Sequence, residues 1–474
     1  MKTIYSLLVI TLLGTSVYAQ KNVDKILKEL DSKTTYYGNI AQTIWDYAEM
    51  GYKEVKSAAL LQKTLKDQGF KITTGVAGIP TAFIAEYGSE GPVIAILGEY
   101  DALPGLSQQA VAEKKSAGAD AGHACGHHLF GTASAAAAIS VKEWLEKTKT
   151  KGRIRFYGCP AEEGGSGKVY MTREGLFKDV DVALHWHPSS VNAANPGAAL
   201  ANKSAKFRFY GVSAHAAGAP EKGRSALDAV ESMNYMVNMM REHIPQEARI
   251  HYVITDGGKA PNVVPNYAEV YYYARHNNRN VVIDIFDRMV NAAKGAALGT
   301  DTTMEYEIIG GTHELLPNHI LQEIMYKNLV ATGGYIYDEK ELQFANEITK
   351  SLGLKELNTS YSEAVVPYTE NSRAYGSTDV GDVSFTVPTV GMGAATWVPG
   401  TPAHSWQAVA AGGTSIGTKG MMVAAKTLSK TAIDLFSNTE IIAKAKKEFE
   451  TRRGADFKYI PLIGDRKPAL NYRD

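Results

Sequence analysis

The sequence predicts an α/β protein in which helices flank a mainly parallel central sheet and an α+β domain is inserted into the chain. Short, nearly continuous apolar runs such as 92–97 and 180–184 alternate with helical patterns such as 129–145. Runs of that kind are typical of parallel strands buried on both faces. From about Lys203 the strands instead alternate apolar and polar residues, with two amphipathic helices between them. We therefore divide the chain into an N-terminal segment 1–19, a main domain 20–202 and 315–474, and an inserted domain 203–314.

The individual elements follow from local patterns. Helical patterns have apolar residues three and four positions apart, and they cover 22–68, 129–145, 225–241, 283–297 and 414–436. We expect the last of these to be the final long element of the chain. Strand patterns cover 82–85, 92–97, 153–158 and 180–184 in the main domain, and 207–212, 250–255, 268–275 and 302–309 in the insertion. The pattern of residues 105–121 predicts a loop.

Residues 1–19 have the three-part pattern of a cleavable signal peptide. Lys2 supplies the positive charge, residues 4–13 the apolar stretch, and Val17-Tyr18-Ala19 a small-residue cleavage site before Gln20. The apolar stretch is too short to span a membrane, and no later stretch of the sequence is long enough. We therefore expect export to a periplasm or secretion, the alternative being a buried N-terminal helix.

The charge balance and the cysteine content give little indication of a partner. The 474 residues carry 50 Lys and Arg against 50 Asp and Glu, so nothing electrostatic favours nucleic acid or a membrane surface. The only two cysteines, Cys125 and Cys159, cannot form a disulfide scaffold. In an oxidising compartment they could still pair with each other, so a functional Cys125 would need a metal to protect it as thiolate.

Segment 122–128, Gly-His-Ala-Cys-Gly-His-His, is the densest group of metal-binding residue types. Cys and His are ligands that transition metals prefer, and the flanking glycines let the backbone approach an ion. Both residue types also occur as ordinary buried residues, so the segment alone does not decide between a metal site and a structural role. The metal interpretation gains from further candidates along the chain, namely Glu162-Glu163, His187 and His404.

Three successive predicted strands end in such side chains. They lead into Asp101, into Glu162-Glu163 and into His187, respectively. Because the carboxyl ends of parallel strands share one edge of a sheet, we expect these groups to converge. Adjacent carboxylates on an extended backbone point in different directions, so one can bind a metal while the other takes a proton from a metal-activated water. The alternative for a Glu-Glu pair is a solvated surface.

Together these motifs resemble the M20 family of metallopeptidases and aminoacylases. The matching segments are 122–127, Pro160 to Gly164, His187-Pro188, Ser213 to Ala217 and Ala403 to Ser405. The resemblance extends over nearly the whole chain after residue 19. The resemblance is to the subgroup with Cys in its metal site, and within it to the branch of the B-type aminobenzoyl-glutamate hydrolase subunits. Most members of the subgroup have Asp where this chain has His128, and the best-known members of the branch lack a signal peptide.

The resemblance implies a site for two divalent metal ions. Its ligands would be Cys125, His127, Glu163, His187 and His404, with Cys125 as a bridge. Zn fits a thiolate ligand best, with Mn and Co as alternatives. Glu162 would be the general base and then the general acid, and Asp101 would orient a ligand histidine.

The inserted domain would be the lid and dimerisation domain of the family. Its His215, on a turn of small residues, would reach the partner subunit's active site and stabilise the oxyanion. The alternative is a surface histidine without a role. Asn262 and Arg275 are candidates to bind a substrate carboxylate, although Arg275 could equally be an ion-pair residue at a strand edge. Asp379 either supports the metal site or caps a turn.

The expected activity is hydrolysis of the amide bond in N-acyl or N-aroyl amino acids, small molecules of the aminobenzoyl-glutamate kind. The expected assembly is a homodimer or a hetero-oligomer with a related subunit. One alternative is a dipeptidase or aminopeptidase of the same fold. Another is a binding protein that has lost turnover, which the presence of every proposed ligand and of the base Glu162 argues against.

Overall fold

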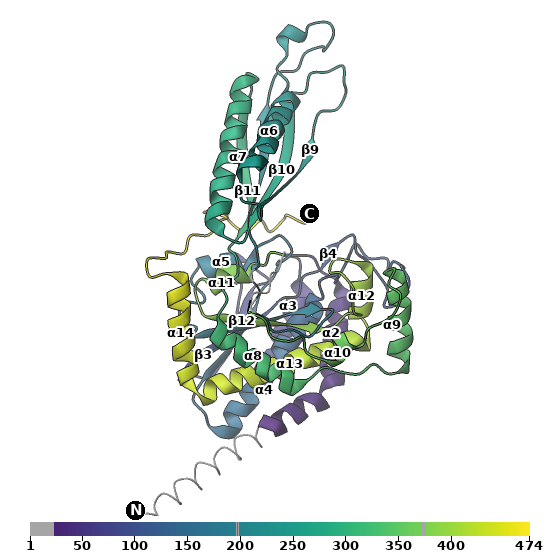
Figure 1. Ribbon diagram of the computed structural model, residues 1–474, viewed down its shortest axis with the longest axis vertical. Coiled ribbons are helices and arrows are strands. Elements are labelled where there is room, and N and C mark those ends of the chain that lie inside the picture. The colour runs from purple at the N-terminus through teal and green to yellow at the C-terminus, as the bar shows by residue number, and fades with distance from the viewer. Residues whose placement is uncertain (1–22, 196, 198, 371–375) are drawn as a thin grey trace, which may run out of the picture.

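The computed structural model describes residues 23–195, 197, 199–370 and 376–474. Figure 1 shows a broad part, in which helices surround the central sheet, and a narrow inserted part that extends away from it. The predicted signal peptide, residues 1–19, lies outside the described residues. No helix among the described residues is long and apolar enough to cross a membrane.

The central sheet has six strands in the order β1-β2-β6-β3-β7-β12. Strands β6, β3, β7 and β12 are parallel to their neighbours in this series. Strand β2 pairs antiparallel with β6, and β1 pairs antiparallel with β2. The prediction of a mainly parallel central sheet flanked by helices is confirmed. The strand bounds are β1 Lys71–Thr74, β2 Phe83–Tyr87, β3 Val93–Gly98, β6 Arg153–Gly158, β7 Val182–Ser189 and β12 Thr389–Ala395.

Strand β3 explains why the sheet is covered on both faces. All six of its residues are buried. Ile94 and Ile96 pack into the core under helices α2, α4, α8 and α13, while Val93 and Leu97 join a second core on the opposite face. Since successive side chains point to opposite faces, an unbroken apolar strand needs a hydrophobic layer on each side.

The helices form the two covering layers. The first contains α2 Thr34–Tyr47, α3 Val55–Asp67, α4 His127–Thr148, α8 His319–Thr332, α13 Ser415–Ser437 and α14 Thr439–Arg453. The opposite face carries the short helices η1 Val76–Gly78, α5 Gly167–Arg173 and α11 Val380–Ser384. The remaining short elements are β4 Leu103–Pro104, β5 Ala121–Gly122, α9 Glu339–Ser351, α10 Ser360–Glu363 and α12 Trp406–Gly412. The small residues of α4 let it pack closely against β3 and α13.

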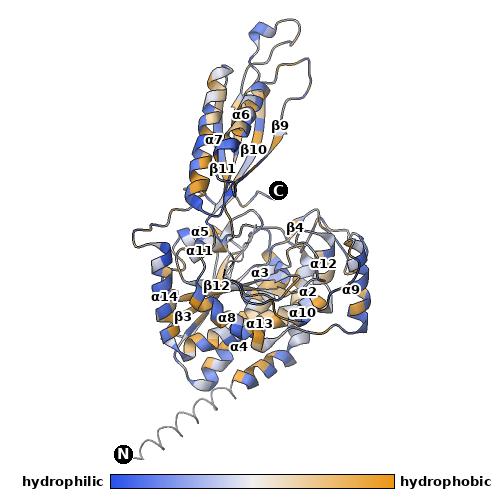
Figure 2. Cartoon of the chain, in the orientation of Figure 1, coloured by the Kyte–Doolittle hydropathy of each residue, from blue (hydrophilic) through white to orange (hydrophobic). Residues whose placement is uncertain are grey.

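The inserted part is a four-stranded antiparallel sheet covered by two helices. The strand order is β11-β8-β10-β9, which leaves β9 at an edge. Its elements are β8 Ala201–Tyr210, η2 Pro220–Lys222, α6 Ala226–Met240, η3 Arg241–His243, β9 Arg249–Asp256, β10 Tyr267–His276, α7 Arg279–Gly299 and β11 Thr303–Thr312. Figure 2 shows α7 with hydrophobic and hydrophilic residues side by side, as expected for a helix that packs one face on the sheet.

Three local expectations differ from the structure. The helical pattern 22–68 is interrupted at Lys33 and again between residues 47 and 55, where the carbonyl of Glu49 accepts the N–H of Ala102 beyond the end of β3. Helix α4 begins at His127, two residues earlier than its pattern. The expectation that 414–436 is the final long helix is wrong, because α14 follows it. Helix α14 has few apolar residues, but its Glu448 accepts the free N–H groups at the start of α8, which ties the two helices together.

Candidate active site

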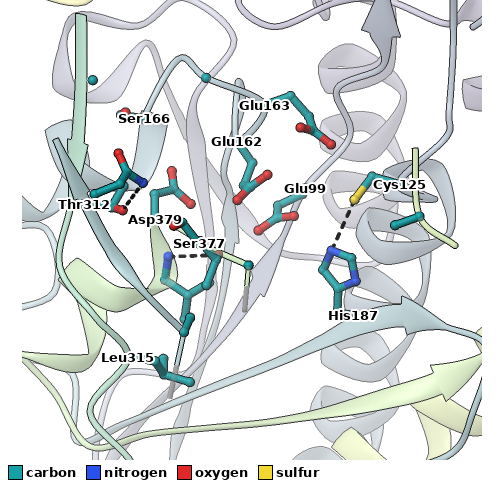
Figure 3. A pocket seen from close by; sticks show the side chains of 18 of the residues that line it. Glu99, Cys125, Glu162, Glu163, Ser166, His187, Thr312, Leu315, Ser377 and Asp379 are labelled. Carbon is teal, nitrogen blue, oxygen red and sulfur yellow. Dashed lines mark hydrogen bonds between the residues drawn. The ribbon is translucent and has the colours of Figure 1, made fainter. Parts of the chain in front are cut away.

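A cavity of about 710 Å³ opens where the carboxyl edge of the central sheet meets the base of the insertion. Figure 3 shows Glu99, Cys125, Glu162, Glu163 and His187 facing this space. The main domain also contributes His404, and strands β8, β10 and β11 contribute Asn202, Ser204, Tyr273, Arg275, Gly310 and Thr312. The metal-binding residue types from three strand ends therefore meet in one place, because β6, β3 and β7 are adjacent and parallel.

Cys125 is held in a sharp turn before α4. Gly126 has φ +76°, and a Cβ at this position would approach the ring of Pro188 to 2.8 Å. Only glycine satisfies both restrictions without strain. The turn places Cys125 Sγ 3.4 Å from His187 Nε2. The Nδ1 atom of His187 lies 2.7 Å from the carbonyl oxygen of Pro188, so Nδ1 carries the proton and Nε2 is free to bind a metal.

Two groups of donor atoms share the Cys125 sulfur. Cys125, His127 and His187 form one, and Cys125, Glu163 and His404 form the other, with the ligand atoms of each group within 4.8 Å of one another. The mixture of thiolate, imidazole and carboxylate suits a transition metal such as zinc. These five residues are the ligands that the sequence resemblance implies.

Unpaired buried atoms support the same fit. Glu163 Oε1 and His127 Nε2 are buried and make no hydrogen bond among the described residues, although His127 Nε2 lies 3.1 Å from Glu99 Oε2. His404 Nε2 lies 3.1 Å from Glu163 Oε1 without hydrogen-bond geometry. Buried polar atoms are rarely left unpaired. Ligand atoms with free lone pairs that face one another in this way therefore fit a bound cation. The arrangement thus fits two divalent cations, which the two donor groups would hold with Cys125 common to both.

The thiol itself needs such a cation. Burial raises the pKa of Cys125 well above that of a free thiol. A bound metal reverses this effect, because a coordinating thiol is deprotonated outright. Cys125 and Cys159 are both unpaired thiols in the structure.

Asp101 connects two parts of the site. Its Oδ1 lies 2.8 Å from His127 Nδ1, and its Oδ2 accepts the backbone N–H of Glu163 at 2.9 Å. Burial would raise the pKa of Asp101, but the charge and hydrogen bond of His127 keep it below its usual value. Asp101 therefore holds His127 in the tautomer that presents Nε2 to a metal, and it also fixes the loop of Glu163.

Glu162 lies in the cavity with a carboxyl group whose surroundings shift its pKa. Its carboxyl group lies in the cavity, and burial together with the charges of Glu99 and Glu163 raises its pKa well above that of an ordinary glutamate. The preceding Ala161 has φ +56°, and its N–H donates to the buried Glu54 at 2.8 Å. This left-handed residue turns the chain so that Glu162 and Glu163 face different parts of the cavity. A raised pKa favours a carboxylate that must both take up and release a proton.

The other two histidines of segment 122–128 have structural roles. His123 Nε2 lies 3.0 Å from the carbonyl oxygen of Ile44, and His128 Nε2 lies 3.1 Å from that of Gly412. Burial lowers the pKa of both rings, so they are neutral. Neither lines the cavity. His128, where the related subgroup usually has Asp, therefore joins α4 to α12 and does not face the metal donors.

Sequence reasoning missed a buried ion cluster beside the donors. Lys168 Nζ lies 2.5 Å from Glu99 Oε1 and 2.7 Å from Asp379 Oδ1, and all three side chains are buried. Glu99 also forms a third donor group with His127 and Glu162. The position of Glu99 directly after β3 could have indicated that it belongs to the site. A single lysine in a short helix gives no such indication in the sequence. Of the two roles considered for Asp379, support of the site fits its contacts.

The insertion brings Arg275 to the cavity but not His215 or Asn262. Arg275 lies at the base of β10 and lines the cavity. His215 and Asn262 are exposed on adjoining loops beyond the far end of the insertion sheet, where Ala216 N–H donates to the Asn262 carbonyl at 3.0 Å. A ten-residue strand such as β8 is about 33 Å long, so His215 cannot reach the cavity of its own chain. The roles assigned to these two residues stay predictions.

Residues 95–408 match the peptidase family M20/M25/M40, so the chain belongs to this family and is a metal-dependent hydrolase. The chain is 44% identical to the B-type subunit of p-aminobenzoyl-glutamate hydrolase from Escherichia coli K12, covering 87% of this chain and 92% of that protein. It is 29% identical to the Xaa-Arg dipeptidase of Mus musculus, covering 93% and 95%. The family resemblance of the sequence is thereby confirmed.

A solved structure shares the fold. The dinuclear metal-binding M20 peptidase of Bacillus subtilis superposes with a TM-score of 0.57 at 17% identity, over 86% of this chain and 99% of that one.

Proposed function

We propose that this chain hydrolyses the amide bond of N-acyl or N-aroyl amino acids, with aminobenzoyl-glutamate-like compounds as the substrate class. The observation that carries the proposal is the pair of donor groups sharing Cys125, with the carboxyl group of Glu162 beside them. The 44% identity to a subunit of p-aminobenzoyl-glutamate hydrolase supports the substrate class. Zn is the proposed metal, because a bridging thiolate favours it over Mn and Co.

In this proposal Cys125, His127, Glu163, His187 and His404 hold the two ions. When bound, the ions polarise the amide carbonyl and lower the pKa of a water molecule. Glu162 accepts the proton of that water and transfers it to the nitrogen of the departing amine. Its raised pKa suits both steps, because the group is a better proton acceptor than an ordinary glutamate and can still donate.

The remaining residues position the substrate. Arg275 supplies a guanidinium from the insertion and suits a carboxylate of the amino-acid part. The cavity of about 710 Å³ has room for an aroyl amino acid, since pockets for small ligands usually measure about 300–1,000 Å³. Asn262 is proposed to contact the substrate together with His215, from a partner subunit.

A homodimer through the insertion is proposed as the assembly. Strand β9 is an edge strand whose Tyr252, Val253 and Ile254 are exposed, and Tyr235 and Met239 are exposed on the neighbouring α6. Apolar side chains along an open edge favour pairing with another chain. Such pairing is the means by which His215 would enter a second active site and stabilise the oxyanion. A hetero-oligomer with a related subunit is the alternative, supported by the 44% identical relative, which is itself one subunit of a hydrolase.

Export by the signal peptide 1–19 is also part of the proposal. The test is N-terminal sequencing of protein recovered from the periplasm or medium, which is expected to begin at Gln20. Protein retained in the cytoplasm with Met1 intact would contradict export.

The activity is tested with chain from Gln20 onward, measuring metal per chain and screening N-(4-aminobenzoyl)-glutamate, other N-acyl amino acids and plain dipeptides. We expect two metals per chain and hydrolysis of one N-acyl class. Preference for dipeptides with a free amine would replace the proposal with the dipeptidase alternative. Absence of metal after reconstitution under reducing conditions would refute it.

A further inference from the structure

The segment after α14, residues 455–474, forms a strap that crosses both parts of the molecule. It first lies against the main domain, where Tyr459 Oη donates to Asp382 at 2.7 Å. It then passes the base of the insertion, where Arg466 donates to the carbonyl oxygen of Ile309. Arg173 of α5 binds the carbonyl oxygen of Arg466 at 2.7 Å. Contacts from several elements thus define the path of the strap.

The strap ends at the active site. Tyr472 Oη and Arg473 Nη2 both donate to the backbone carbonyl of Glu163, at 3.0 and 2.6 Å. The ring of Tyr472 packs edge-on against Tyr52, and the guanidinium of Arg473 lies over the ring of Tyr472 with Cζ 4.7 Å from its centroid. These contacts fix the direction of Arg473 relative to the metal donor Glu163.

Arg473 has donor capacity that the protein does not use. Its side chain lines the same cavity as the metal donors, and its Nε is buried without a hydrogen-bond partner. Arg466 on the same strap pairs with Glu307, whereas no ion pair of Arg473 is found within the part of the chain that the structure describes. A partly buried guanidinium with an unused N–H and no ion pair is suited to bind an anion that enters the cavity.

We infer that Arg473 is a substrate-binding residue whose guanidinium binds a carboxylate of the amide substrate. The inference rests on the proposed amidohydrolase function and adds a specificity residue from outside the insertion. A planar guanidinium is suited to bidentate binding of carboxylate, and its anchoring to Glu163 sets the distance from that carboxylate to the metal donors. Arg275 reaches the cavity from β10, so positive groups enter it from two separate elements.

The test compares Arg473→Gln and Arg473→Lys with the wild type on N-benzoyl-glutamate and its two monoamides. We expect Arg473→Gln to raise KM about tenfold or more for N-benzoyl-glutamate, because it removes a charged hydrogen-bond donor to the carboxylate. KM should change little for the monoamide that lacks the bound carboxylate. Arg473→Lys should recover part of the loss. Tyr472→Phe is the matched control, because it removes a hydrogen bond to the same carbonyl without removing a charge.

Two readouts separate substrate binding from support of Glu163. Metal content is expected to be unchanged in Arg473→Gln. An equal loss on all three substrates, or a parallel loss of metal, would overturn the inference and leave Arg473 as a support for the metal ligand.

A binding measurement keeps the inference testable if the proposed function fails. Calorimetric titration of N-benzoyl-glutamate into Glu162→Gln, with and without Arg473→Gln, needs no turnover. Weaker binding in the double variant supports the inference, and equal binding overturns it. Failure of the wild type to hydrolyse any of the three substrates would contradict the proposed function alone.

Discussion

The buried cation Lys168 is predicted to be a large contributor to the stability of the main domain. Its ammonium group lies between Glu99 and Asp379, and its backbone N–H donates to the second oxygen of Asp379 at 2.9 Å. Lys168→Met keeps the length of the side chain and removes the charge. Two buried carboxylates then lose their shared cation, and breaking a buried pair in this way costs about 3–5 kcal/mol.

An exposed pair of equal length provides the matched control. Lys350 Nζ lies 2.7 Å from Glu347, the same distance as from Lys168 to Asp379, but both side chains are more than half exposed. Solvent screens such a pair, so Lys350→Met should change the free energy of unfolding by about 0.5 kcal/mol or less. The two substitutions therefore share an ion-pair distance of 2.7 Å but differ in burial and in the number of carboxylates, which is two for Lys168 and one for Lys350.

The assay is urea denaturation followed by the fluorescence of the five tryptophans, which include the buried Trp186 in β7 of the central sheet. Each protein is measured with metal and after chelation, so that weaker metal binding is separated from the loss of the ion pairs. The reasoning would be refuted if Lys168→Met lost less than about 1 kcal/mol after chelation, or no more than Lys350→Met. Either result would mean that Glu99 and Asp379 are neutral or solvated in the native protein.

The remaining predictions concern the active site. Glu162→Gln should retain two metals and lower kcat by about 10²–10⁴-fold, the usual contribution of general acid–base catalysis, and near-normal activity would exclude it as the base. Cys125→Ser should lower the metal content measured by elemental analysis, because a hydroxyl is a poorer ligand than a thiolate; unchanged stoichiometry would argue against a bridging sulfur. His215→Ala should reduce kcat while leaving metal content intact. Mixing it with Glu162→Gln should restore part of the activity if subunits exchange and share their sites, and no recovery between exchanging subunits would count against sharing.

Local sequence determined the framework of the site. The apolar run of β3 predicts a strand buried on both faces, and the carboxylates that follow it are readable as a strand end. Segment 122–128 and Glu162-Glu163 indicate metal ligands, because few kinds of side chain can bind a transition metal. These features depend on residues close together in the chain, so pattern and chemistry suffice to find them.

Tertiary structure decided which of those side chains act together. Segment 122–128 offers three imidazoles, yet only His127 belongs to a donor group, since the start of α4 and the carbonyls of Ile44 and Gly412 hold the other two elsewhere. The second donor group joins residues 125, 163 and 404, which no local pattern connects.

The residues that sequence reasoning missed are those whose partners are distant. Lys168 has the pattern of an ordinary helix lysine, and it becomes part of the site only because β3 and α11 bring Glu99 and Asp379 to it. Arg473 lies more than 300 positions from Glu163, and only the path of the strap brings the two together. The sequence by itself determined the fold class and the kinds of ligand, because these follow from periodicity and donor chemistry. The charge network and the substrate-facing groups depend on long-range packing, so only the tertiary structure decided them.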